Sequence, residues 1–147
     1  MKLVSDAIED LDLTARPRHR DDRPTNLSPM EWELIKIHAQ AGADIIKGVT
    51  FPWPVAEMIV QHHERLDGSG YPCGLRGEEI CLGARIIAVA DTVEAMSSHR
   101  PYRPALGVDA AVEEIVNGRG RLFEPAVVDA CVALVHSGRI RLGTTWD

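Results

Sequence analysis

The chain has 147 residues, enough for one domain whose core needs neither disulfides nor a structural metal in order to fold. Sixteen Lys and Arg against 22 Asp and Glu give a net charge of −6, which excludes binding to DNA or RNA polymers through bulk positive charge. Aromatic residues make up only 5% of the chain, so the core must be largely aliphatic, which favours packed helices.

Cysteine usage and the apolar pattern indicate where the protein works. Cys73, Cys81 and Cys131 are odd in number and lack a CxxC spacing, which indicates reduced thiols. The first residues lack the apolar segment of a signal peptide, and no apolar run reaches the roughly 20 residues that cross a bilayer. We therefore expect a cytoplasmic protein that has no membrane segment.

In chain order, an N-terminal arm is expected over residues 1–26. Residues 1–13 can form a short helix, and a charged loop with two prolines follows it. The main domain is expected over residues 27–138. Its first helix should begin at Ser28, where Pro29 and Glu31 complete a capping box, and should continue to about Lys47 before Gly48.

Four more helices are expected, at about 54–64, 82–98, 108–117 and 125–136. The first two are separated by a loop dense in glycine, DGSGYPCGLRGEEI, of the kind that carries functional residues. The helix at 82–98 is apolar almost all round, which predicts a central, buried position. Residues 139–147 form a tail. The fold class is therefore all-α.

Metal-binding side chains interrupt the apolar pattern on three of these helices. His38 lies near the inward stripe of the first, and His62 and His63 extend the buried face of the second. Adjacent helical residues point about 100° apart, so this pair could serve two neighbouring metals. Asp91 lies within the apolar helix, where a carboxylate needs a cation. Alternatively, His38 is a hydrogen-bonded core residue and Asp91 pairs with Arg85 or Arg100.

Two further groups could bind phosphate. In the loop, the glycines allow close approach of backbone N–H groups and Tyr71 can donate a hydrogen bond, although tight turns with positive φ angles also require glycine. After the apolar helix, Arg100 and Arg103 are spaced to clamp phosphate oxygens. The alternative for these arginines is a surface ion pair with Glu113 or Glu114.

The segment HHERLDGSGYPCGLRGEEICLGARIIAVADTVEAMSSHRPYRPAL closely resembles the HD-GYP family of bacterial phosphodiesterases, and Gly70, Tyr71 and Pro72 form the GYP triplet. The resemblance runs from about Leu27 to about Leu134. It implies a helical bundle around two or three metal ions, iron or manganese, and hydrolysis of cyclic di-GMP to pGpG or GMP.

The resemblance also implies a role for each candidate residue. His38, His62, His63 and Asp91 match metal ligands, and Glu94 matches an acidic residue near the substrate, so that Asp91 and Glu94 are the catalytic candidates. The substrate-binding positions are Gly70, Tyr71, Arg100 and Arg103.

The sequence departs from the family where an upstream His-Asp pair, followed by Gly-Lys, is expected. Counting back from His38 reaches Glu9 and Asp10, which are followed by Leu-Asp-Leu. Asp10 can stand for the family's Asp and Glu9 for its His, as further metal ligands. The expected fold is thus an HD-domain-like helical bundle that lacks its first helices and binds one or two ions, with zinc as a further candidate.

Two functions follow. In the first, the chain is a metal-dependent phosphodiesterase acting on cyclic di-GMP. In the second, it is an inactive module that binds a cyclic dinucleotide or other signalling proteins; a third reading is a fragment without an independent role. Absence of the first helices would expose an apolar face on the helix that carries Asp91, which predicts a homo-oligomer.

Overall fold

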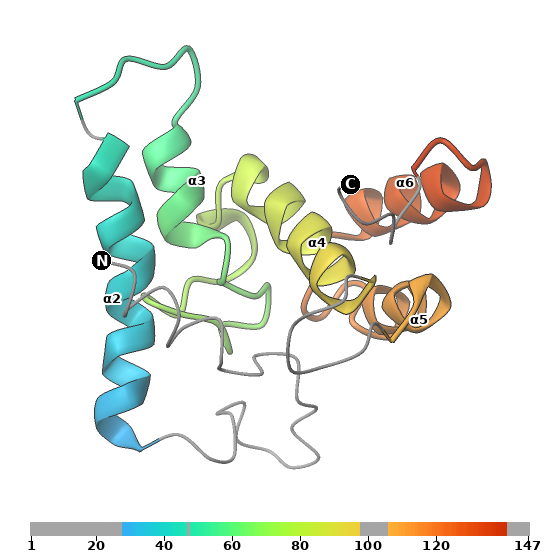
Figure 1. Ribbon diagram of the computed structural model, residues 1–147, viewed down its shortest axis with the longest axis horizontal. Coiled ribbons are helices and arrows are strands. Elements are labelled where there is room, and N and C mark those ends of the chain that lie inside the picture. Colours follow the sequence, from blue (N-terminus) through green and yellow to red (C-terminus); the bar gives the residue numbers. More distant parts are fainter. Residues whose placement is uncertain (1–27, 47, 98–105, 141–147) are drawn as a thin grey trace, which may run out of the picture.

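The computed structural model describes residues 28–46, 48–97 and 106–140. Those residues form five α-helices and a short 3-10 helix, with no β-strand among them, so the predicted all-α class is confirmed (Figure 1). The predicted arm at residues 1–26 and the end of the tail, residues 141–147, lie outside the described residues.

The helix bounds agree closely with the sequence prediction, except at one helix. The helix expected at 54–64 begins one residue later and ends at Gln61, three residues early. It ends there because the Glu64 N–H donates to the Gln61 carbonyl over 2.9 Å, a tighter turn than the α-helix makes. In chain order the elements are α2 (Pro29–Ile46), α3 (Val55–Gln61), η1 (Gly77–Glu79), α4 (Leu82–Ser97), α5 (Val108–Asn117) and α6 (Pro125–His136).

Two groups of helices meet at α4. On one side, α2 lies along α3, where the buried Ala39 and Ala43 leave room for close packing and Gly42 faces Ile59 (Figure 1). On the other side, α4 contacts α5 and α6. Because α4 also contacts α3, it joins the two groups, and its predicted central position is confirmed.

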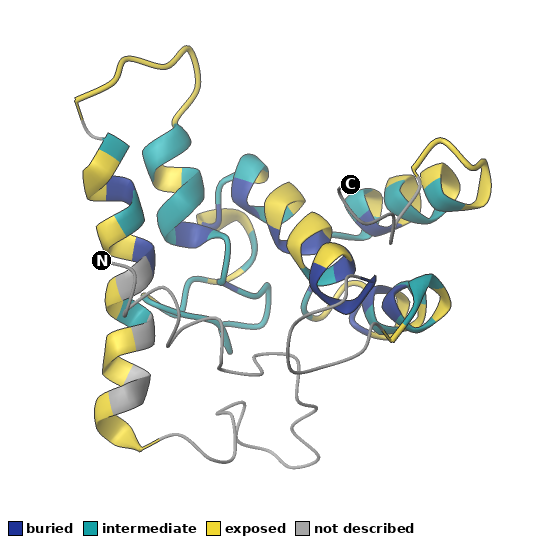
Figure 2. Ribbon diagram, viewed as in Figure 1, coloured by how far each residue is buried: buried dark blue, intermediate teal, exposed yellow. Residues whose placement is uncertain are grey.

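The hydrophobic core lies where α4 meets α5 and α6. Figure 2 shows the buried residues of α4 on the side that faces these two helices. The cluster is mainly aliphatic, as the composition predicts, and it takes one aromatic ring from the α5–α6 connection. Its members are Val89, Val93, Met96, Ala111, Ile115, Phe123 and Val128.

The opposite face of α4 is apolar and exposed, which confirms the expected exposed apolar face and limits the predicted burial of this helix to one side. Leu82 is 55% exposed and Ile86 is 47% exposed, and Ile87 and Ala90 are exposed as well. The described neighbours cover only part of the helix circumference, so an apolar residue on α4 is buried only where one of them contacts it. No helix in the described ranges is both long and apolar enough to cross a membrane.

Candidate functional site

The two adjacent histidines lie just past the end of α3, not on the helix as predicted. His62 is the C-cap, with φ −66° and ψ −16°, and His63 continues into the turn. Their ring centroids are 3.8 Å apart and the ring planes are tilted by 40°. The turn therefore brings the two imidazoles together, where a continuing helix would direct them about 100° apart.

A backbone contact selects the tautomer of His62. Its Nδ1 lies 2.6 Å from the Ile59 carbonyl oxygen, and because a carbonyl can only accept, Nδ1 carries the hydrogen. In the neutral ring Nε2 is then the nitrogen that can bind a metal, the arrangement usual for metal-binding histidines. The chemistry of this nitrogen fits a divalent ion.

The described side chains do not complete such a site by themselves. Among the side chains that the structure describes, no three of His, Cys, Asp or Glu gather as a metal-binding group. His38 lies on α2, but its side chain is outside the described set, as are Glu9 and Asp10. The ligand roles of these three residues therefore stay predictions.

Tyr71 lies directly against the histidines. Its ring stacks on His63 with centroids 4.7 Å apart, and its backbone N–H donates to the His63 carbonyl over 3.3 Å. Burial raises the pKa of the Tyr71 phenol, the charge of Arg65 partly opposes this shift, and the charge of Asp91 adds to it. The phenol therefore keeps its proton at neutral pH and can donate a hydrogen bond to an anionic ligand.

Asp91 is exposed on α4, which corrects the expectation of a buried carboxylate. Its charge acts on the pKa of both Arg65 and Tyr71, so this part of α4 lies close to the loop. Arg85, the partner considered for Asp91, instead forms an ion pair with Glu124 over 2.6 Å. Glu94, one helical turn further along, is also exposed. Asp91 is thus placed where an added cation can reach it.

Gly70 is required by close packing, and its predicted approach to a phosphate stays a prediction. A Cβ at this position would lie 2.5 Å from the His63 carbonyl oxygen and from the Arg65 nitrogen. Its backbone is not left-handed, so the need is for space alone. The absence of a side chain lets the loop segment that carries Tyr71 lie directly on the residues that carry the imidazoles.

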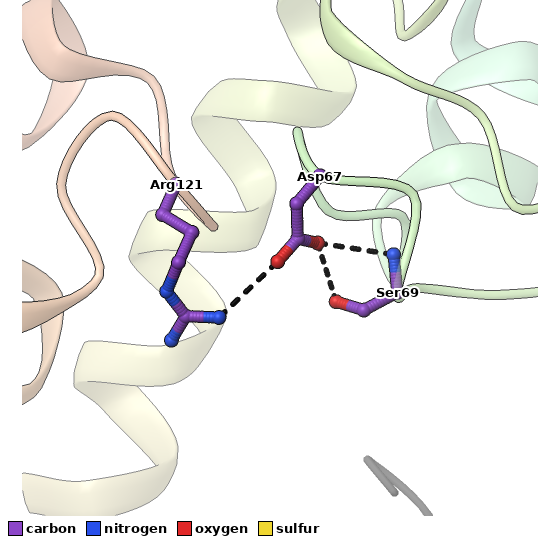
Figure 3. Close-up of polar contacts among 3 residues, drawn as sticks. All are labelled: Asp67, Ser69 and Arg121. Carbon is purple, nitrogen blue, oxygen red and sulfur yellow. Dashed lines mark hydrogen bonds and ion pairs between the residues drawn. The ribbon is translucent and has the colours of Figure 1, made fainter. Parts of the chain in front are cut away.

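The sequence reasoning missed a set of contacts that connect this loop to the α5–α6 turn. The Asp67 carboxylate accepts hydrogen bonds from the Ser69 N–H at 3.0 Å and hydroxyl at 2.5 Å, and from Arg121 at 3.1 Å (Figure 3). Burial alone would raise the pKa of Asp67, but the two bonds from Ser69 and the charge of Arg121 outweigh it and lower the pKa.

Two further contacts join the same segments. The Leu66 N–H donates to the Leu122 carbonyl over 3.2 Å, and the Arg65 guanidinium lies over the Phe123 ring, 5.2 Å from its centroid. The sequence offers one signal for the bonds between Asp67 and Ser69, because an Asp two residues before a Ser in a glycine-rich loop is typical of an Asx turn. Nothing in the sequence pairs residues 65–67 with residues 121–123, because the contact spans more than fifty residues.

The remaining predicted site residues are Arg100 and Arg103. Both lie outside the described residues, so their role as a phosphate clamp stays a prediction. The described part of the site is therefore the imidazole pair, the stacked Tyr71, and the acidic residues of α4.

Comparison with known proteins identifies relatives. The HD domain family matches residues 10–127. The cyclic di-GMP phosphodiesterase response regulator RpfG of Xanthomonas campestris is 46% identical over 110 residues, which are 74% of this chain and 29% of that protein. A cyclic di-GMP phosphodiesterase of Thermotoga maritima is 41% identical over 114 residues, 76% of this chain and 31% of that protein.

Relatives named for a second cyclic dinucleotide also match. The 3'3'-cGAMP-specific phosphodiesterase 3 of Vibrio cholerae is 42% identical over 91 residues, 62% of this chain and 20% of that protein. The fold is similar to a crystal structure of a cyclic GMP-AMP specific phosphodiesterase from V. cholerae, with a TM-score of 0.63 at 24% identity over 92% of this chain and 33% of that chain.

The chain spans a third or less of the length of these proteins. The likeness to the solved structure shows a common fold, and the family match covers most of the residues described above as well as Asp10. The chain therefore belongs to the HD domain family, as the resemblance of its sequence to the HD-GYP phosphodiesterases predicted.

Proposed function

We propose that this domain binds cyclic di-GMP and hydrolyses it to pGpG or GMP in a reaction that depends on a divalent metal, iron or manganese. The observation that carries the proposal is the pair of imidazoles 3.8 Å apart, with the Tyr71 ring stacked on one of them. Two matching relatives are named as cyclic di-GMP phosphodiesterases, which supports the choice of substrate.

The proposed roles follow from the chemistry of each group. His62 and His63 bind the metal together with Asp91, His38 and, from the N-terminal arm, Asp10 or Glu9. When bound, one or two divalent ions would supply an activated water and neutralise charge on the phosphoryl oxygens. Tyr71, which keeps its phenolic proton, donates to a phosphate oxygen. Arg100 and Arg103 bind the same phosphates, and Glu94 lies at the edge of the site.

The place and partners of the domain belong to the same proposal. Cyclic di-GMP is an intracellular messenger in bacteria, so we propose a cytoplasmic domain that acts alongside other signalling proteins. Self-association through the exposed face of α4 is part of this proposal, because Leu82 and Ile86 expose half of their surface there.

The first test is metal content per chain, by elemental analysis of anaerobically purified protein, combined with chromatography of cyclic di-GMP digests. We expect bound metal and hydrolysis in the wild type. In His62→Ala both the metal content and the hydrolysis should fall, hydrolysis by at least about 100-fold. Even the mutation of a residue that only hydrogen-bonds to a metal ligand lowers metal affinity or activity by about 10- to 100-fold. The matched control is His136→Ala, which removes an exposed histidine at the end of α6 and should change neither.

The outcomes separate the two predicted functions. Two ions per chain, lost in His62→Ala, would support Glu9 or Asp10 as ligands in an active phosphodiesterase. Binding of cyclic di-GMP without hydrolysis would instead support the module that only binds. A wild-type protein that neither binds nor cleaves cyclic di-GMP would contradict the proposal.

A further inference from the structure

Glu64, directly after the two histidines, is the largest buried charged group in the described residues, with 2% of its surface exposed. Burial of a carboxylate is costly unless hydrogen bonds compensate for the lost water. Three backbone N–H groups do so. Glu64 Oε1 accepts from Cys73 at 2.6 Å and Gly74 at 3.2 Å, and Oε2 accepts from Leu75 at 3.0 Å.

These three donors come from consecutive residues that lie nine to eleven positions after Glu64 in the chain. Consecutive N–H groups can converge on one anion only where the backbone curls, and Gly74 provides this with φ +68°. The carboxylate therefore closes the loop on itself: the chain leaves at Arg65, passes Tyr71 and returns to Glu64 at Cys73.

The closure lies two residues beyond Tyr71. On the near side of Tyr71, Gly70 packs on the backbone of residues 63–65, and the Tyr71 N–H donates to the His63 carbonyl. On the far side, the bond from Cys73 to Glu64 is the shortest of the three. Tyr71 is thus held from both sides against the ring of His63, and Glu64 provides the hold on the far side.

We propose that Glu64 is a positioning residue: its carboxylate binds the backbone of residues 73–75 and so keeps the Tyr71 phenol beside the imidazole pair. Its role in ligand binding rests on the proposed function, whereas its effect on Tyr71 does not. Glu64 itself does not touch the ligand, because both carboxylate oxygens are used by the loop.

The experiment measures the position of Tyr71 directly. Tyr71 and Tyr102 are the two tyrosines of the chain, so Tyr102→Phe protein made with 3-fluorotyrosine gives one fluorine resonance, from Tyr71. In Glu64→Gln, an NH₂ group replaces one acceptor and faces backbone donors, so at least one of the three bonds is lost. We expect the resonance to move toward that of free tyrosine, since stacking on His63 is weakened.

Glu79→Gln is the matched control. The Glu79 carboxylate also accepts a backbone hydrogen bond, from Arg76 at 2.8 Å, but Glu79 is exposed and the amide oxygen of Gln can keep that single bond. Its fluorine resonance should stay at the wild-type position. Cooperative unfolding of each variant shows that it folds, and Glu64→Asp, shorter by one methylene, replaces Glu64→Gln if the latter does not fold.

Ligand binding then tests the functional part. We expect Glu64→Gln to weaken cyclic di-GMP binding by about tenfold, as the loss of one or two kcal/mol implies. In a Tyr71→Phe background the same change should have little further effect, because Glu64 acts through the phenol. An unchanged Tyr71 resonance in a folded Glu64→Gln protein would overturn the positioning role. If the resonance shifts in Glu64→Gln but the wild-type protein binds no cyclic di-GMP, the positioning role is kept and the proposed function is rejected.

Discussion

At the scale of single residues, this site depends on a glycine whose role is steric. Gly70 has no left-handed backbone to maintain, but a methyl group there would overlap the carbonyl of His63 and the nitrogen of Arg65. Backbone atoms on both sides cannot move apart as a flexible side chain can. The distance between the Tyr71 segment and the imidazole pair is therefore set by the smallest residue in the loop.

Gly70→Ala should consequently destabilise the domain by about 1–3 kcal/mol, the usual cost of overpacking. Urea unfolding followed by circular dichroism measures the change. Gly48→Ala is the matched control, because a Cβ at Gly48 meets no atom within 4 Å. The control should stay within about 0.5 kcal/mol of wild type. Equal stability of Gly70→Ala and wild type would contradict the steric role.

At the scale of elements, the loop after α3 is anchored to the α5–α6 turn as well as to its own backbone. Asp67 pairs with Arg121, Leu66 donates to Leu122, and Arg65 covers Phe123, whose ring belongs to the core. Three adjacent residues of the loop thus contact three adjacent residues of the turn. The hydrophobic core and the candidate site are coupled through this contact.

The stability that Asp67 provides should depend on pH in a defined direction. The pKa of Asp67 is lower in the folded state than in the unfolded chain, so its stabilisation is complete above the unfolded value, near pH 4, and is lost as the pH falls through the folded-state pKa. Asp67→Asn should cost up to about 1 kcal/mol at pH 7. The difference in melting temperature between variant and wild type should shrink below pH 4.

Asp129→Asn is the control for this prediction. Asp129 also pairs with an arginine, Arg119, at 2.6 Å, but on an exposed surface where water screens the interaction. Its removal should lower the melting temperature less than removal of Asp67 does. A difference for Asp67→Asn that stays constant from pH 7 to pH 3 would show that the carboxylate charge is not the stabilising element.

At the scale of the whole molecule, the exposed side of α4 is an apolar surface beside the site. Leu82, Ile86 and Ala90 follow one another at intervals of four residues, so they form one stripe along the helix. Asp91 adjoins this stripe, and its charge acts on the pKa of Tyr71 in the loop. A second copy seated on the stripe would therefore lie next to the candidate metal ligands.

Light scattering after size-exclusion chromatography tests this arrangement over a range of concentrations. We expect a mass above 16.2 kDa that rises with concentration, and a return to the monomer mass in Ile86→Lys, because a charge on the stripe opposes burial. Leu134→Lys changes a residue of α6 that is 37% exposed, away from the stripe, and serves as the control. A wild-type protein that stays monomeric at the highest concentration would contradict the predicted oligomer.

Local properties of the sequence were enough to predict the bounds of four of the five described α-helices closely. The bounds of α5 and α6 agree to the residue. Each helix is flanked by residues that favour a helix end within one or two positions of it: Gly107 and Gly118 for α5, and Pro125 and Ser137 for α6. The resemblance of the segment around Gly70, Tyr71 and Pro72 was enough to predict the family. Both kinds of signal are contiguous in the chain.

Tertiary structure alone decided how the site is built. The burial of Glu64 under the N–H groups of residues 73–75 and the pairing of Asp67 with Arg121 join residues whose contact no local pattern encodes. Tertiary structure also decided that Asp91 is exposed, although its helix is apolar in sequence. The reason is physical: propensity and periodicity act over one or two turns of chain, whereas burial and hydrogen bonding depend on which distant segment fills the space opposite.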